Sequence, residues 1–161
     1  MATLEILEHP DQRLRQKAMP VATFDSQLAS LVEDMLETMY AHAGIGLAAP
    51  QVDTASQIIV CDVAGDGSAQ RTLINPEIIA SGQPGRIEET CLSVPGEKGV
   101  VKRPTRITVR AMDTAGKRFT TALEGLEAVC VHHEIDHLHG ILFIDHLALW
   151  RRLRLPKRAS L

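Results

Sequence analysis

Residues 125–140 read GLEAVCVHHEIDHLHG, and this stretch decides how the rest of the chain must fold. Along it, apolar side chains and two histidines, His133 and His137, recur on one side at helical spacing, and Gly140 ends the pattern. The period predicts a helix over 125–139. Because one face carries apolar residues together with histidines, we expect the other elements to pack around this helix.

The two histidines are four residues apart, so one helical turn, about 6 Å, separates their rings along the axis. Two imidazoles placed in this way can converge on one metal ion. His132 and His139 point to the opposite side of the helix. We interpret His132 as exposed or as packed behind a metal ligand, and His139 as a cation at the negative C-terminus of the helix.

Glu134 completes an HExxH motif over residues 133–137. In this motif the glutamate lies beside the metal without binding it, where it can take a proton from a metal-bound water. A polar surface patch is the alternative, but the interleaved apolar positions are unusual for a solvated helix face. The motif therefore favours a hydrolytic metal site.

A catalytic metal site needs a third protein ligand and an open position. Cys130 lies about 10.5 Å along the helix axis from His137, too far to share the ion, and we interpret it as a small buried side chain. Cys61 has the same interpretation, because its surroundings are typical of an interior strand. Cys91 is the candidate, since EETCLSVPGEKG (88–99) is bounded by glycine, proline and charges and can present a thiol to the helix.

A second unusual stretch is GIGLAAPQ, residues 44–51. Its glycines and small side chains let backbone come close to a ligand, although a glycine here can also simply end the preceding helix. The amide of Gln51 can donate a hydrogen bond to a developing oxyanion.

The other elements are shorter or less regular. We predict a helix from about residue 25 to 42, strands at 57–63 and 72–79, a hairpin from 106–112 through a turn at 113–117, and a buried strand or strand-like exit at 141–147. This order predicts an α+β fold in which small antiparallel or mixed sheets pack around the central helix. The length predicts a single domain over 1–161.

Composition excludes several classes of protein. Hydrophobic residues make up 45% and charged residues 23%, which is typical of a globular domain, and no run approaches the roughly 18 apolar residues of a membrane span. The first twenty residues lack the apolar stretch of a secretory signal, and three cysteines leave one unpaired. We therefore predict a cytoplasmic protein with no membrane partner.

The charge of the chain is uneven. The tail RRLRLPKRASL (151–161) has five basic side chains and no acid, whereas residues 1–150 hold 12 basic residues against 20 acids, a net charge of about −8. The tail is either a solvated terminus or a contact with a phosphate-rich partner such as RNA.

Three motifs together resemble a known family. GIGLAAPQ (44–51), ETCLS (89–93) and HHEIDH (132–137), in this order and at these separations, resemble the signature motifs of bacterial peptide deformylase. The resemblance extends from LEILEHPDQRLRQKAMPV (4–21) to HGILFIDHL (139–147). It implies that Cys91, His133 and His137 are the metal ligands and that Glu134 is the general acid/base. It also implies that Gln51 and the backbone N–H of Leu92 are the oxyanion donors.

The resemblance also implies the reaction. Family members hold one divalent metal, Fe(II) in the cell, with Ni, Co or Zn able to replace it, and release formate from the N-formylmethionine of nascent chains. The expected mechanism is attack of a metal-bound hydroxide on the formyl carbon, with Glu134 carrying the proton to the leaving amine. A monomer that contacts the ribosome through the basic tail is expected, without a specific DNA partner.

By similarity, an apolar pocket for the methionine side chain would consist of Ile45, Ile87, Leu126, Val129 and Cys130, although each would also suit an ordinary core. Gly46, Glu89 and Thr90 would border the bound peptide. Arg103 matches a residue that contacts the peptide backbone, and an exposed surface arginine is the alternative.

The chain departs from the family pattern at three places. Thr90 stands where glycine is usual, His132 where glutamine is common, and YAHAG (40–44) lacks a frequent acidic residue. The β-branched Thr90 can narrow the cleft and alter the substrate. Two alternatives to a deformylase therefore remain: an HExxH hydrolase acting on other N-acyl groups or on internal peptide bonds, and a non-enzymatic binding protein.

Overall fold

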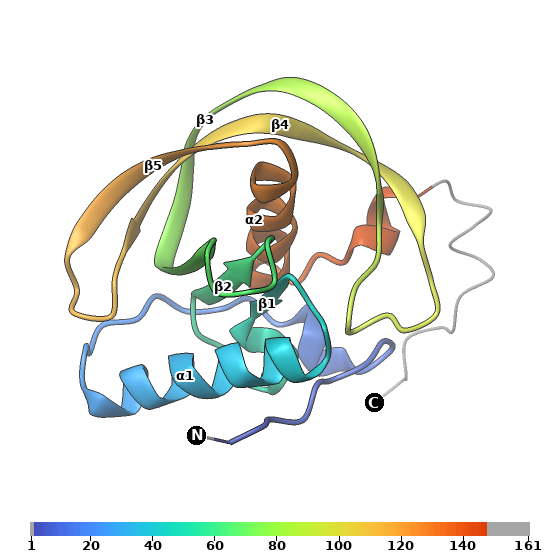
Figure 1. The fold of residues 1–161 in the computed structure, drawn as a ribbon. Helices are drawn as coiled ribbons and strands as arrows, with labels where there is room; N and C mark the ends of the chain where they lie inside the picture. Colours follow the sequence, from blue (N-terminus) through green and yellow to red (C-terminus); the bar gives the residue numbers. More distant parts are fainter. Residues whose placement is uncertain (1, 148–161) are drawn as a thin grey trace.

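The computed structural model describes residues 2–147, in which five antiparallel strands form one sheet in the order β1-β2-β3-β4-β5 (Figure 1). The strands are β1 (Gly46–Ala48), β2 (Ile58–Asp62), β3 (Gln70–Glu89), β4 (Gly99–Met112) and β5 (Arg118–Glu124). The helices are α1 (Ser26–Ala41) and α2 (Gly125–Leu138), with short 3-10 turns η1 (Gln12–Arg15), η2 (Ala49–Val52) and η3 (Phe143–His146). The predicted α+β class is confirmed, with one sheet in place of several small ones.

Helix α2 lies at the centre, beneath the arch of β3 and β4 (Figure 1). Nine of its fourteen residues are buried, so the solvent-exposed face of this helix is narrower than that of an ordinary surface helix. Three of the nine, His133, Glu134 and His137, are polar. Because buried polar groups cost free energy unless they are paired, these side chains need partners from the surrounding elements.

Helix α1 matches its predicted extent. The Asp25 side chain caps its first turn by accepting from the N–H of Leu28 at 3.0 Å. Its apolar face packs on β1 and β2 in a cluster that includes Met35 and Met39. The chain leaves the helix through Ala43 at φ +53° and continues at once into β1, which places residues 44–48 against α2.

The long β3–β4 hairpin is the main difference from the prediction. The predicted strand at 72–79 is only the first part of β3, and the predicted strand at 106–112 is the second half of β4. Register shifts near Ile74 and Ile78 bend the ladder, and Pro84 faces Pro104, where neither residue has an N–H to contribute. The hairpin curls over α2, so Cys91, two residues beyond β3, reaches the helix.

The predicted strand at 141–147 is wrong. The segment contains the turn η3, and the Asp145 side chain accepts from the N–H of Leu142 at 3.0 Å and from Arg15, which favours a turn over a ladder. Its apolar residues are buried because they pack with Leu7 and Val94. The tail 151–161 lies outside the described residues. Within residues 2–147, no helix has the length and apolar character needed to cross a membrane.

Candidate metal and catalytic site

Cys91, His133 and His137 meet at one point beneath the β3–β4 arch. Cys91 Sγ lies 3.4 Å from His137 Nε2, His137 Nε2 lies 3.2 Å from His133 Nε2, and the three ligand atoms are all within 4.8 Å of one another. Atoms bound at 2.0–2.3 Å around a tetrahedral ion are about 3.3–3.6 Å apart, so the spacing fits one metal ion. A thiolate with two imidazoles suits Fe, Co, Ni or Zn.

The surroundings shift the pKa values of the two histidines in opposite directions. Burial would lower the pKa of His133, but hydrogen bonds to Cys91 and Glu89 and the charge of Glu134 raise it well above its usual value. Burial, together with the charges of His133 and Arg103, lowers the pKa of His137 well below its usual value. Both shifts reflect burial and the charged groups packed around two adjacent imidazoles.

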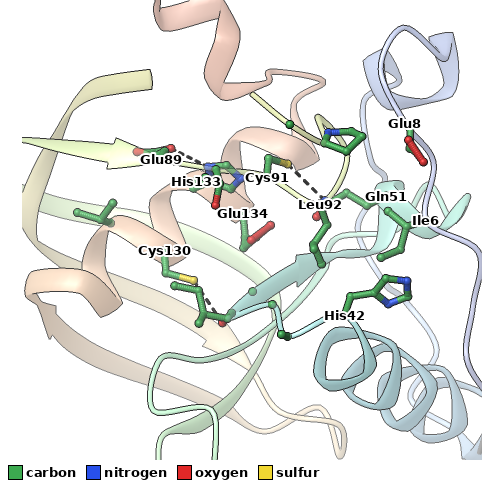
Figure 2. A pocket seen from close by; sticks show the side chains of 18 of the residues that line it. Ile6, Glu8, His42, Gln51, Glu89, Cys91, Leu92, Cys130, His133 and Glu134 are labelled. Atoms are coloured by element: carbon green, nitrogen blue, oxygen red, sulfur yellow. Dashed lines mark hydrogen bonds and ion pairs between the residues drawn. The ribbon is translucent and has the colours of Figure 1, made fainter. Parts of the chain in front are cut away.

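Glu134 lies on the cavity side of α2 with its carboxyl group buried (Figure 2). Its Oε1 lies 3.9 Å from His137 Nε2 and has no hydrogen-bond partner among the described residues. Burial raises the pKa of Glu134 to about 7, partly offset by the charges of His133 and Arg103. A carboxyl group with a pKa near neutrality can both accept and donate a proton at physiological pH.

Gln51 is held rigidly beside Cys91. Its side-chain oxygen accepts from the N–H of Ala48 at 2.9 Å, and its Nε2 donates to Ser93 Oγ at 3.0 Å and lies 3.7 Å from Cys91 Sγ. Within residues 2–147 the backbone N–H of Leu92 has no hydrogen-bond acceptor. The side-chain amide of Gln51 and the backbone N–H of Leu92 therefore both lie next to the predicted metal ligand Cys91.

A cavity of about 840 Å³ opens onto these groups (Figure 2). The structure brings together on its wall all but one of the residues predicted to bind substrate: Ile45, Gly46, Ile87, Glu89, Thr90, Leu126, Val129 and Cys130. Ile45 and Leu126 are exposed at 37% and 46%, whereas Val129 and Cys130 are buried deeper in the wall. The cavity is therefore apolar on the side away from Gln51.

Arg103 is the exception. It does not line the cavity, and the alternative of an exposed surface residue is wrong, because its side chain is only 1% exposed. Its guanidinium donates to Glu89, Asp136 and His132. His132 is thus a neighbour of the ligands rather than a surface residue, and His139 occupies the C-cap position of α2, where its backbone N–H bonds to the carbonyls of Asp136 and His137.

The sequence interpretation missed several residues at the site. Ser93 holds Gln51, Asp136 holds Arg103, and His146 in turn bonds to Asp136. Ser93 and Asp136 lie within the recognised motifs. The wall of the cavity also includes Leu4, Glu5, Ile6, Glu8 and His42, and no local pattern marks them. Backbone hydrogen bonds fix the segment 4–8, including one of 2.8 Å from the N–H of Leu7 to the carbonyl of Gln51.

Comparison with known proteins finds similarity to peptide deformylases over most of the chain. The family model described as polypeptide deformylase matches residues 3–152. A peptide deformylase from Legionella pneumophila is 46% identical, with a TM-score of 0.92 over 95% of this chain and 90% of that one. The peptide deformylase from Thermotoga maritima is 39% identical (TM-score 0.87, 92% and 99%), and that from Ehrlichia chaffeensis is 34% identical (TM-score 0.89, 95% and 92%).

Proposed function

The chain belongs to the polypeptide deformylase family and is a peptide deformylase, as the three motifs predict. From this premise we propose how its residues act on nascent chains that begin with N-formylmethionine. The observation that carries the proposal is the meeting of Cys91, His133 and His137 beside Glu134 and Gln51, at the wall of one cavity.

Cys91, His133 and His137 would hold one divalent ion, with Fe(II) as the natural metal and Ni, Co or Zn as replacements. Such an ion polarises a carbonyl group and lowers the pKa of water enough to supply a nucleophile at neutral pH. Two ligands come from one helix and the third from the segment just after β3, so the protein fixes their relative positions before any metal arrives.

Glu134 is the proposed general acid/base. A formamide has a poor amine leaving group, so the reaction needs a group that accepts a proton from the attacking water and returns it to the amine nitrogen. The buried carboxyl group of Glu134 has a pKa of about 7 and an oxygen without a partner in the described protein, which suits both steps. Gly46 leaves the space that this carboxyl group occupies.

Gln51 and the backbone N–H of Leu92 are the proposed oxyanion donors. As the carbonyl carbon becomes tetrahedral, negative charge develops on its oxygen, and donors held in advance stabilise that charge without reorganising. The bonds from Gln51 to Ala48 and Ser93 fix its amide, so its Nε2 keeps its direction next to Cys91.

The methionine side chain would lie in the apolar part of the cavity, lined by Ile45, Ile87, Leu126, Val129 and Cys130. The peptide backbone would pass between Gly46 and the end of β3, because β2 pairs only with residues 70–74 of β3 and leaves the later edge free. Thr90 is exposed beside this path, so it would narrow the entry for the residue that follows methionine.

The remaining proposals concern the whole protein. We place it in the cytoplasm as a monomer, with the ribosome as a partner through the basic tail 151–161. The support is the composition of the chain, the uneven charge and the substrate, which is available only while a nascent chain is being made.

The test is formate release from a formyl-Met-Ala-Ser peptide by Fe(II)- or Ni(II)-loaded protein prepared without oxygen, beside the Glu134→Ala variant. We expect metal-dependent release that falls by at least about a hundredfold in the variant while the metal stays bound. No release from this peptide, together with cleavage of other N-acyl or internal peptides, would show that Thr90 and its neighbours select a different substrate. No cleavage of any peptide would favour the binding-protein alternative.

A further inference from the structure

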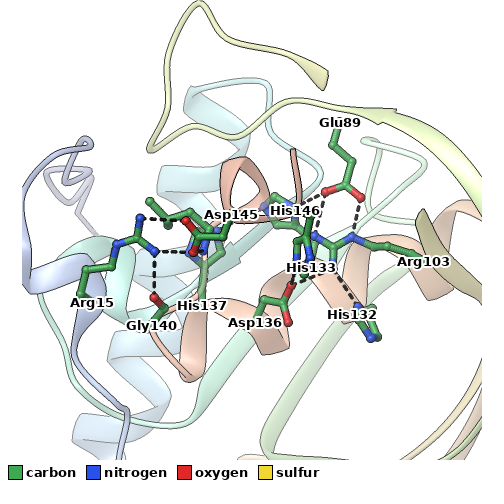
Figure 3. Close-up of polar contacts among 11 residues, drawn as sticks. Arg15, Glu89, Arg103, His132, His133, Asp136, His137, Gly140, Asp145 and His146 are labelled. Atoms are coloured by element: carbon green, nitrogen blue, oxygen red, sulfur yellow. Dashed lines mark hydrogen bonds and ion pairs between the residues drawn. The ribbon is translucent and has the colours of Figure 1, made fainter. Parts of the chain in front are cut away.

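Arg103 is the most deeply buried charged side chain near the site, and each of its three guanidinium nitrogens donates a hydrogen bond (Figure 3). Nε donates to Glu89 Oε2, and NH2 donates to Glu89 Oε1 at 3.0 Å. NH1 donates to Asp136 Oδ2 and to His132 Nδ1, both at 2.8 Å. Four of the five N–H donors of a guanidinium therefore have acceptors within the protein, and Arg103 does not line the cavity.

Glu89 connects the guanidinium to a metal ligand. Its Oε1 accepts from His133 Nδ1 at 2.7 Å, so Nδ1 carries a hydrogen and Nε2 is the ring nitrogen directed toward His137. His137 has no equivalent anchor, because its Nδ1 has no hydrogen-bond partner among the described residues. The orientation of the ligand set therefore depends on the Glu89–His133 pair.

The other end of the guanidinium is also fixed. Asp136 immediately precedes the ligand His137, and its Oδ2 accepts from both Arg103 NH1 and His146 Nε2, the latter at 2.9 Å. A single planar group on β4 thus joins the end of β3 to helix α2, and Asp136 extends the network to His146 in turn η3 (Figure 3). A lysine ammonium is a point charge on a flexible stem and cannot hold these acceptors in one plane.

We propose that Arg103 is a positioning residue for the metal site: through Glu89 it fixes the ring and the hydrogen of His133, and it does not contact the substrate. The proposal rests on the proposed function only for the reaction that follows metal binding. Outer partners of metal ligands act in this way by orienting the ligand before the ion binds.

The test is the Arg103→Lys variant, compared with wild type and with Arg110→Lys. Arg110 lies on the same strand in an exposed ion pair with Glu77 at 3.0 Å, so it is a matched control. We expect Arg103→Lys to lose Ni(II) to a chelator about 10- to 100-fold more readily and to shift the visible absorption of the Co(II)-loaded protein. With saturating metal, kcat should fall while KM for formyl-Met-Ala-Ser stays within about twofold. Arg110→Lys should match wild type.

Two results would overturn the proposal. One is metal retention and a Co(II) spectrum equal to the control, and the other is a raised KM with unchanged metal retention and kcat, which would make Arg103 a substrate contact. If Arg103→Lys does not fold, Glu89→Gln decides, because it leaves Arg103 bonded to Asp136 and His132: it should show the same metal loss, and normal retention would overturn the proposal. Metal retention is measured without turnover, so absence of deformylase activity in wild type would count against the proposed function alone.

Discussion

Gly46 is required by the space around the general acid/base. A Cβ at this position would lie 2.5 Å from Glu134 Oε2 and 2.7 Å from Cys130 Sγ. We predict that Gly46→Ala displaces the carboxyl group and lowers kcat by roughly a hundredfold, because small displacements of reacting groups are costly. Gly82→Ala is the matched control, since its Cβ would meet nothing within 4 Å. Steady-state kinetics of both variants at equal metal content would decide, and equal activity would contradict the prediction.

Most of the site residues were predictable from sequence because they lie in short motifs. The i, i+4 spacing of His133 and His137 is a property of the helix itself. Arg103 was misinterpreted because its partners, Glu89, His132 and Asp136, come from β3 and α2, and no local pattern shows that an arginine of β4 is buried among them. The role of such a residue depends on contacts that only the tertiary structure shows.

Both ends of helix α2 have glycines with positive φ, and the two glycines differ in the space around the position of a Cβ atom. Gly125 has φ +61° with nothing near its Cβ position, whereas Gly140 has φ +72° and its Cβ would lie 2.4 Å from the carbonyl oxygen of Arg15. We predict that Gly125→Ala costs about 1 kcal/mol of unfolding free energy from backbone strain alone. Gly140→Ala should cost clearly more, because η1 must also move. Urea unfolding measures both, and equal losses would contradict the role assigned to the Arg15 contact.

The turn after β2 depends on one carboxylate. Asp62 is buried and accepts from the N–H groups of Ala64, Gly65 and Gly67 and from the hydroxyl of Tyr40. Burial would raise the pKa of Asp62, but the hydrogen bonds from Tyr40 and the three N–H groups outweigh it and hold the pKa below its ordinary value.

A folded-state pKa below the unfolded one means that Asp62 stabilises the protein at any pH above the unfolded value, about 3.9. This stabilisation is lost as the pH falls through the folded pKa. We therefore predict that wild type loses more stability than Asp62→Asn on going from about pH 5 to pH 3. Chemical unfolding of the two proteins across this range tests it, and parallel curves would contradict it.

Helices and strands with a regular hydrophobic period were predictable from sequence, and segments whose structure depends on contacts with residues distant in the sequence were not. Helices α1 and α2 and the β4–β5 hairpin follow from local patterns. β3 continues through ASGQPGRIEE (80–89), where glycine and proline suggest a loop, because β4 pairs with it over its whole second half. The apolar run at 141–147 indicates burial correctly, but burial alone does not distinguish a strand from a turn that Asp145 and Arg15 hold.

At the scale of the whole molecule, the cavity faces incoming peptides with negative charge. Glu5, Glu8 and Glu88 line it, no lysine or arginine does so among the described residues, and residues 1–150 carry about −8. None of the three glutamates has an ion-pair partner within residues 2–147. A cleft lined by one sign of charge raises the local concentration of ligands of the opposite charge. The charges of the residues that follow methionine in the peptide should therefore affect turnover.

We predict that a formyl-Met-Ala-Lys-Lys peptide has a kcat/KM several-fold higher than formyl-Met-Ala-Glu-Glu at low salt, and that the two values converge near 1 M salt, where charges a few ångströms apart are screened. Glu8→Gln should reduce the ratio. Glu33→Gln, an exposed glutamate on α1 outside the cavity, should leave it unchanged. If the ratio does not change with salt or with Glu8→Gln, the preference arises from contacts of the side chains and not from the field of the cavity.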